Sequence, residues 1–274
     1  MDQKQLDELL AGLAVGPGRY FERVGSTNDE AARWVEAGAP DLALVVADEQ
    51  TAGRGRSGRR WFTPPGAALA FSLVLRQDPA HRADLAAPEI LGRVPALAAL
   101  ALCEALQRDY SLPAQVKWPN DVLINRRKVC GILAEAHWHG ERLAVVILGM
   151  GINVAAGALP AQADWIYPPT SVESELGRPV ERFALLRSVL ERISAWRSQL
   201  GSTEFLQAWE SRLAFRGEWV AVFAAGPQGS PPWREGQVLG LEADGSLRLR
   251  ERSGLVTSVH SGEVRLRPID SSAR

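Results

Sequence analysis

Residues 115–154 constrain the fold most, because they read as consecutive β-strands joined by tight turns. The sequence Asn125-Arg126-Arg127 separates the first pair of apolar runs, and His139-Gly140-Glu141 separates the next. Short polar or glycine-containing breaks between such runs are typical of hairpins. The centre of the chain therefore predicts a largely antiparallel sheet.

Apolar runs on both sides of this stretch add strands and helices. Leucines at the spacing of one helical face predict a short helix over residues 6–13. Ser26 or Thr27 is a suitable N-cap for a second helix, with Gly38 just past its end. The runs LALVVADEQ and AALAFSLVLR predict buried strands. Further helices are expected over residues 90–109, 183–199 and 203–213.

The pattern changes after Arg216, where short alternating runs are separated by glycine turns. Asp244-Gly245 and Ser253-Gly254 are strong hairpin signals. A loop, GPQGSPP, interrupts the first runs of this region. We therefore expect two domains, a larger one over residues 1–216 and a small all-β one over residues 217–270.

Composition excludes several classes of protein. The chain has 31 Lys and Arg against 32 Asp and Glu, whereas a dedicated nucleic-acid binder usually carries a basic excess. Its two cysteines form no C-x-x-C pair, which suits a reducing compartment. The N-terminal segment lacks the basic start of a signal peptide, and the longest uncharged apolar run, 94–103, is half a membrane span. These features predict a cytoplasmic protein that does not enter a membrane.

The segment GRGRSGRRW, residues 53–61, combines the G-x-G-x-x-G pattern with four arginines. A dinucleotide fingerprint needs a helix after its glycines, and Pro64-Pro65 would interrupt one. Glycine permits close backbone approach, and arginine supplies a fork of donors for carboxylate and phosphate oxygens. The segment is interpreted as a loop that folds over an anionic adduct, with a solvated basic loop as the alternative.

Four other clusters accompany this loop in a fixed order: STN at 26–28, KWPND at 117–121, RRKVCGIL at 126–133 and GMGINV at 149–154. Together with QTAGRGRSGRRW, these motifs resemble those of the biotin–protein ligases over about residues 20–155. The resemblance implies an α+β fold, with a mixed, largely antiparallel sheet and helices like those of class II aminoacyl-tRNA synthetases. It also implies a small C-terminal SH3-like β-barrel.

The same resemblance implies an ATP-dependent ligase that works in two half-reactions. Biotin and MgATP would give biotinyl-5′-AMP and pyrophosphate, and a lysine of a biotin carboxyl carrier protein, such as an acetyl-CoA carboxylase subunit, would then displace AMP. ATP and Mg²⁺ enter as a substrate complex, and no tightly bound cofactor is expected. Only 25 residues precede Ser26, too few for the winged-helix domain of the bifunctional repressors, so no binding to operator DNA is expected. Members of the family are monomers or homodimers.

The resemblance also assigns roles to individual residues. Lys128, Arg56 and Asp121 would be catalytic, with Lys128 bridging the carboxylate of biotin and the α-phosphate. The biotin-binding set would be Ser26, Thr27, Asn28, Gln50, Gly53, Arg54, Gly55, Arg56, Lys128 and Gly131. The nucleotide-binding set would be Arg54, Arg56, Trp61, Asn120, Lys128 and Asn153. An exposed Asp121 carboxylate would hold Mg²⁺ through water or steer the acceptor lysine, and Lys117 would be mainly structural.

Simpler roles remain open for several of these residues. Ser26 and Thr27 suit a helix cap, Trp61 suits a protein core, and Lys128 suits an exposed hairpin. Two further sites are discounted: His137 and His139 lack a third metal ligand, and Cys130 is expected to be a buried filler. Two other functions compete with the main one. A lipoate or octanoate ligase would share the fold, and a nucleic-acid-binding module would use the arginines of the 53–61 loop.

Overall fold

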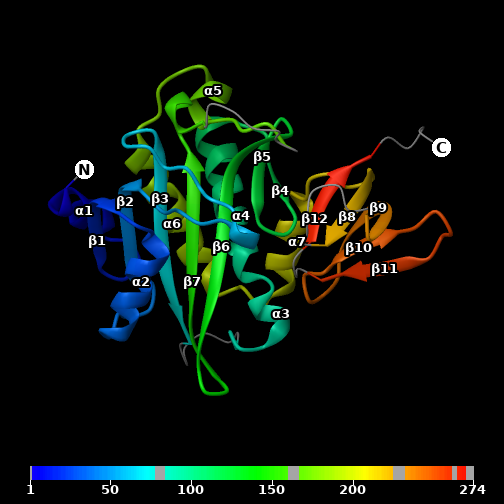
Figure 1. The fold of residues 1–274 in the computed structure, drawn as a ribbon, viewed down its shortest axis with the longest axis horizontal. Helices are drawn as coiled ribbons and strands as arrows, with labels where there is room; N and C mark the ends of the chain where they lie inside the picture. Colours follow the sequence, from blue (N-terminus) through cyan, green and yellow to red (C-terminus); the bar gives the residue numbers. More distant parts are fainter. Residues whose placement is uncertain (1, 78–83, 160–166, 225–231, 261–263, 270–274) are drawn as a thin grey trace.

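The computed structural model describes residues 2–77, 84–159, 167–224, 232–260 and 264–269. Their strands form two sheets, which stand side by side in Figure 1. The larger sheet has the order β1-β2-β3-β7-β6-β5-β4, and the smaller has the order β11-β10-β9-β8-β12. Among the strands of the described residues, β1 and β2 pair in parallel and the other strand pairs are antiparallel; two isolated bridges, Val116 with Leu213 and Lys128 with Pro169, are also parallel. The predicted α+β fold with a largely antiparallel sheet is confirmed.

The strands of the larger sheet are β1 (Gly18–Val24), β2 (Leu44–Gln50), β3 (Ala68–Arg76), β4 (Ala114–Lys117), β5 (Asp121–Ile124), β6 (Arg127–His139) and β7 (Arg142–Asn153). The two predicted turns lie where expected. Asn125 and Arg126 have φ values of 49° and 63° between β5 and β6, and Gly140 has a φ of 59° between β6 and β7. The sequence analysis missed β1, the half-exposed edge strand.

Helices cover both faces of the larger sheet. They are α1 (Gln3–Leu10), α2 (Thr27–Glu36), α3 (Pro88–Leu91), α4 (Val94–Tyr110), α5 (Val172–Leu176), α6 (Arg182–Arg197) and α7 (Thr203–Ser211). Phe71 and Leu73 of β3 share one core cluster with residues of α4 and α6, whereas Val74 shares another with Ala31 and Trp34 of α2. Because both of its faces are covered, β3 is a continuous apolar run rather than an alternating one.

The smaller sheet is formed by β8 (Trp219–Ala224), β9 (Arg234–Leu241), β10 (Leu247–Arg250), β11 (Val256–Val259) and β12 (Val264–Pro268). The predicted hairpin glycines, Gly245 and Gly254, have φ values of 82° and 86°. Residues 225–231, most of the predicted GPQGSPP loop, lie outside the described residues. The domain boundary after residue 216 stays a prediction.

Candidate functional site

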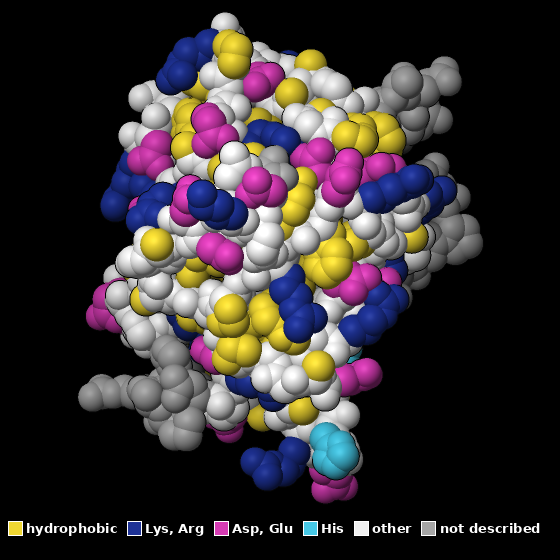
Figure 2. Space-filling view, turned by 90° about the vertical axis from the view of Figure 1, so that its left-hand side faces the viewer, with side chains coloured by type: hydrophobic (Ala, Val, Ile, Leu, Met, Phe, Trp, Pro, Cys, Tyr) yellow, Lys and Arg dark blue, Asp and Glu magenta, His cyan; other side chains and the backbone are white. Residues whose placement is uncertain are grey.

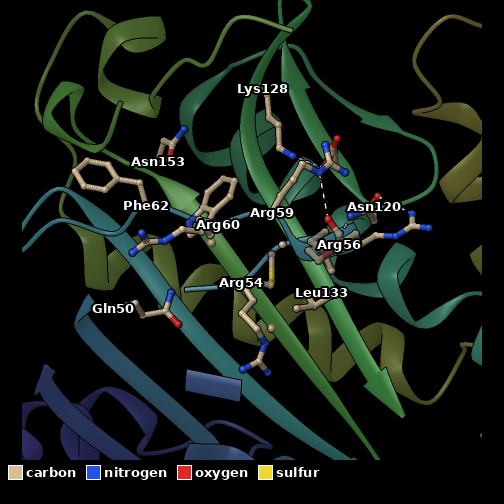
Figure 3. A pocket seen from close by; sticks show the side chains of 18 of the residues that line it. Gln50, Arg54, Arg56, Arg59, Arg60, Phe62, Asn120, Lys128, Leu133 and Asn153 are labelled. Atoms are coloured by element: carbon tan, nitrogen blue, oxygen red, sulfur yellow. Dashed lines mark hydrogen bonds and ion pairs between the residues drawn. The ribbon is translucent and has the colours of Figure 1, made fainter. Parts of the chain in front are cut away.

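A cavity of about 550 Å³ opens between the 53–61 loop and the paired strands β6 and β7 (Figure 3). It is lined by every residue predicted for the site except Gly53. Other lining residues were not assigned a role from the sequence, among them Phe62, Leu133, Gly149, Gly151 and Tyr167. The structure therefore brings together motifs that are spread over more than a hundred residues of sequence.

Glycines make the floor of this cavity. Gly131 of β6 pairs with Gly151 of β7. A Cβ atom added to Gly151 would lie 2.1 Å from Nε1 of Trp61, and one added to Gly149 would lie 2.2 Å from Oδ1 of Asn28. Both distances are far below van der Waals contact. Only glycine at these positions lets two polar or aromatic side chains lie directly on the strand backbone.

A polar cluster closes the end of the cavity nearest β2. Oε1 of Gln50 accepts hydrogen bonds from the backbone N–H and the hydroxyl of Thr27, at 2.9 and 3.1 Å. Nε2 of Gln50 donates to Thr63 at 3.1 Å. The buried hydroxyl of Ser72 lies 2.8 Å from Oγ1 of Thr27 and 2.6 Å from Oδ1 of Asn28. Ser72 was missed, although it is the one polar residue inside the apolar run of β3.

The start of α2 presents this cluster. Ser26 occupies the N-cap position, as predicted, but its side chain makes no capping hydrogen bond. Ser26, Thr27 and Asn28 are all buried. Burial of three consecutive polar residues at a helix start indicates a polar end to an otherwise apolar cavity.

The 53–61 loop folds back on itself. The backbone N–H of Gly55 donates to the carbonyl of Arg59 at 2.6 Å, and that of Trp61 donates to Gly53 at 2.8 Å. A Cβ atom at Gly53 would lie 2.6 Å from the Trp61 carbonyl oxygen, so Gly53 allows the loop to close. Gly53 was predicted to contact biotin, and it does not line the cavity. In the described residues between Gly58 and Pro88 the chain forms no α-helix, in agreement with the rejection of a dinucleotide fingerprint.

Two arginines of the loop are held by different partners. Arg54 forms ion pairs with Asp29 of α2 and with Glu135 of β6, the latter at 3.0 Å. The hydrogen bond to Asp29 is the main cause of the raised pKa of Arg54. Arg56 donates to Oδ1 of Asn120 at 3.1 Å, on the far side of the cavity from Gln50 (Figure 3). Arg54 therefore ties the loop to α2 and β6, and Arg56 ties it to the segment before β5.

Asp121 lies at the centre of a buried ionic cluster. Its Oδ1 accepts a hydrogen bond from Lys128 at 2.6 Å, and its Oδ2 accepts one from Lys117 at 3.1 Å. Burial would raise the pKa of Asp121, but the ammonium groups of Lys128 and Lys117 outweigh burial and lower it. Burial lowers the pKa of Lys117 in spite of Asp121. Asp121 is only 8% exposed, so the expectation of an exposed carboxylate was wrong.

Aromatic rings border this cluster. Nζ of Lys128 lies 5.5 Å from the ring centroid of Trp61, and Nζ of Lys117 lies 4.8 Å from that of Tyr167. Nε1 of Trp61 is buried and has no hydrogen-bond partner in the part of the chain that the structure describes, as expected of a ring that packs on the glycine floor. Asn153 is buried and donates to the carbonyl of Thr170 at 3.0 Å.

Three predictions about the surroundings of the site can also be checked. Cys130 is fully buried, and burial raises the pKa of its thiol, as expected of a filler residue. The described residues contain no cluster of three or more metal-ligating side chains, and His139 is exposed. In the described part of the chain, no helix has both the length and the apolarity that crossing a membrane requires.

Comparisons with known proteins agree with this geometry. A family model described as biotin/lipoate A/B protein ligase matches residues 20–153. A biotin–[acetyl-CoA-carboxylase] ligase of Paracoccus denitrificans is 37% identical, over 85% of this chain and 93% of that protein. A bifunctional ligase/repressor of Bacillus subtilis is 30% identical, over 90% and 73%. The solved structure of a biotin protein ligase of Aquifex aeolicus with biotin and ATP has a TM-score of 0.73 at 29% identity, over 92% and 99%.

Proposed function

This chain belongs to the biotin–protein ligase family, and we propose on that premise that it activates biotin with ATP and transfers it to a carrier protein. The single observation that carries the proposal is the position of Lys128. Its ammonium group lies at the cavity wall, 2.6 Å from a buried carboxylate and beside a glycine floor. A cation fixed in this way suits a reaction that joins a carboxylate to a phosphate.

In the first half-reaction, a carboxylate oxygen of biotin attacks the α-phosphorus of ATP. The bond from that phosphorus to the bridging oxygen breaks, and pyrophosphate leaves. We propose that Lys128 and Arg56 stabilise the negative charge that develops on the α-phosphate, since positioned cations contribute most to the catalysis of phosphoryl transfer. Trp61 and Asn153 would contact the nucleotide.

The polar cluster around Thr27 and Gln50 would hold the ureido ring of biotin. Each of these groups already has a fixed partner, so their orientation is set before the ligand arrives. Because these side chains are already ordered, the binding of biotin costs less conformational entropy. Gly131 and Gly151 would let the indole of Trp61 lie on the sheet, where it would border the bound adenylate.

In the second half-reaction, the neutral ε-amine of an acceptor lysine attacks the biotinyl carbonyl carbon, and AMP leaves. We propose that the acceptor belongs to a biotin carboxyl carrier protein, such as the one acted on by the Paracoccus relative. Because both oxygens of Asp121 are occupied by ammonium groups, we assign Mg²⁺ to the phosphates of ATP rather than to this carboxylate. Asp121 would orient Lys128.

The nucleic-acid alternative is less well supported. Arg54 is neutralised by two carboxylates, and basic and acidic side chains are interspersed on the face shown in Figure 2. A nucleic-acid-binding surface usually gathers one sign of charge.

The two cysteines are free and buried, which supports the proposal of a cytoplasmic location.

ATP–pyrophosphate exchange tests the proposal directly. The purified protein is incubated with MgATP, labelled pyrophosphate and either biotin, lipoate, octanoate or no acid. We expect exchange with biotin alone. Exchange with lipoate or octanoate instead would move the chain to the sister activity, and exchange with none would overturn the assignment. A gel-shift titration with duplex DNA at low salt tests the alternative, for which no binding is expected.

A further inference from the structure

We propose that Trp118 is a positioning residue, through which the smaller sheet holds the segment that carries Asn120 and Asp121. The proposal rests on the function proposed above, because it concerns the nucleotide side of the same cavity. It assigns a task to the tryptophan of the KWPND motif, whose side chain does not line that cavity.

One hydrogen bond links the segment before β5 to the smaller sheet. Trp118 is 1% exposed, and its Nε1 donates to the carbonyl oxygen of Gly245 at 3.0 Å. Gly245 belongs to the turn between β9 and β10. A buried indole N–H that lost this acceptor would lose a hydrogen bond that water could not replace. The side chain of Trp118 is therefore fixed by the smaller sheet.

A second bond holds the same turn. The guanidinium group of Arg93, at the start of α4, donates to the carbonyl of Ala243, and also to that of Leu200 at 3.0 Å. Arg93 is itself buried. Trp118 and Arg93 therefore hold the β9–β10 turn through hydrogen bonds to two of its backbone carbonyl groups. In Figure 1 the smaller sheet lies beside β4 and α7.

The turn needs glycine at position 245 for two reasons. Its φ of 82° lies in the left-handed region, and an added Cβ atom would lie 2.8 Å from the ring of Trp209. Trp209 of α7 therefore packs directly against the residue that accepts the Trp118 bond. The Nε1 atom of Trp209 has no hydrogen-bond partner among the described residues.

Residues 212–214, which follow α7, also bond to β4, the strand just before Trp118. The backbone N–H of Val116 donates to the carbonyl of Arg212 at 2.8 Å, and that of Ala214 donates to Val116 at 2.9 Å. The segment 116–118 is therefore fixed by residues that lead into the smaller sheet, as well as by its partner strand β5.

The functional consequence follows from what comes next in sequence. Asn120 accepts the hydrogen bond from Arg56, and Asp121 holds Lys128. Arg56 and Lys128 are the two cations that we assigned above to the α-phosphate, so they connect this segment to the use of ATP. In contrast, the cluster around Thr27 and Gln50 is built on α2, β2 and β3, none of which bonds to the β9–β10 turn. Loosening Trp118 should disturb the use of ATP and leave the binding of biotin intact.

The test compares Trp118→Phe with Trp209→Phe in the full chain. Both variants lose the same ring atoms from a buried site, but only the first loses a hydrogen-bonded N–H. Steady-state pyrophosphate exchange gives kcat and KM for ATP, and equilibrium dialysis with labelled biotin gives the Kd for biotin. Thermal unfolding of both variants sets a measuring temperature at which each is folded.

We expect Trp118→Phe to lower kcat/KM for ATP about three- to tenfold, the range of one hydrogen bond, with the Kd for biotin unchanged. Trp209→Phe removes ring atoms beside Gly245 but keeps the Trp118 hydrogen bond, so it should lower kcat/KM for ATP less than Trp118→Phe does and leave the Kd for biotin unchanged. Equal kcat/KM in the two variants would overturn the proposal, and so would a loss of biotin affinity as large as the loss for ATP. If Trp118→Phe does not fold, the same two quantities are measured for Arg93→Lys, which changes the other side chain that holds the β9–β10 turn, and the same outcomes apply. A wild-type protein without biotin-dependent exchange would refute the proposed function instead.

Discussion

Replacing Asp121 with asparagine should destabilise the protein strongly, although the two side chains have nearly the same shape. The carboxylate accepts one hydrogen bond on each oxygen, from Lys117 and from Lys128. An amide keeps one acceptor oxygen, and its NH₂ group would face an ammonium group that has only donors. The buried Lys117 would then lose its counter-charge.

The magnitude follows from the burial of this cluster. Removing one partner of a buried ion pair costs about 3–5 kcal/mol, because the other charge stays buried without compensation. For a chain of this size, about 3 kcal/mol corresponds to a fall of about 6–12 °C in the melting temperature. The pKa of Asp121 lies below its ordinary value of 3.8. Its contribution to stability is therefore present above pH 3.8 and is lost as the pH falls further.

Thermal unfolding at pH 7 and at stepwise lower pH checks both statements. The difference between the wild type and Asp121→Asn should be largest near neutrality and should shrink below pH 3.8. Glu8→Gln is the matched control, since it neutralises an exposed carboxylate that lies 3.7 Å from Lys4. It should change the melting temperature by about 1 °C or less. If Asp121→Asn were no more harmful than Glu8→Gln, the buried-cluster argument would be refuted.

Four further perturbations test the site. Lys128→Ala should lower biotin-dependent pyrophosphate exchange by about a hundredfold or more without unfolding the protein, and near-normal exchange would remove Lys128 from its role. Arg56→Gly should weaken retention of biotinyl-AMP, seen by mass spectrometry as biotin on bystander lysines; unchanged acceptor selectivity would count against Arg56. Gly151→Ala should lower kcat/KM for exchange about tenfold or more, because the new Cβ would displace Trp61, and an unaffected enzyme would mean that the indole moves freely. Deleting residues 217–274 should abolish biotin transfer in a carrier-protein assay, and a fully active truncation would make that region dispensable.

Local patterns were sufficient to predict most of the fold. The turns at Asn125 and Gly140 predict antiparallel hairpins, and both hairpins are present. The edge strand β1 was missed because it is half-exposed, and because its parallel pairing with β2 has no local turn to mark it. Parallel partners are joined through intervening elements, so their pairing is decided by tertiary packing.

The site was predicted from motifs, which identify residues but not their partners. The resemblance placed Arg54 over the ligand, whereas in the structure its guanidinium also pairs with Asp29 and Glu135. Glu135 carried no signal, because an acidic residue in a half-exposed strand usually faces solvent. The motif gave no sign that Asp121, the first residue of β5, is buried. Its burial arises because Lys117 of β4 and Lys128 of β6 reach it from the two strands that flank β5.

The arrangement of the two lysines explains how a carboxylate is tolerated beside two anionic substrates. Lys117 is 7% exposed and lies on the buried side of Asp121, whereas the side chain of Lys128 is 25% exposed and borders the cavity. With all three groups ionised, one carboxylate and two ammonium groups leave one net positive charge. Lys117 offsets the carboxylate from behind, so the charge of Lys128 remains available to the ligand. A sequence that kept Asp121 and lost Lys117 would present a neutral pair to ATP, so we expect Lys117 to support the reaction although it does not line the cavity.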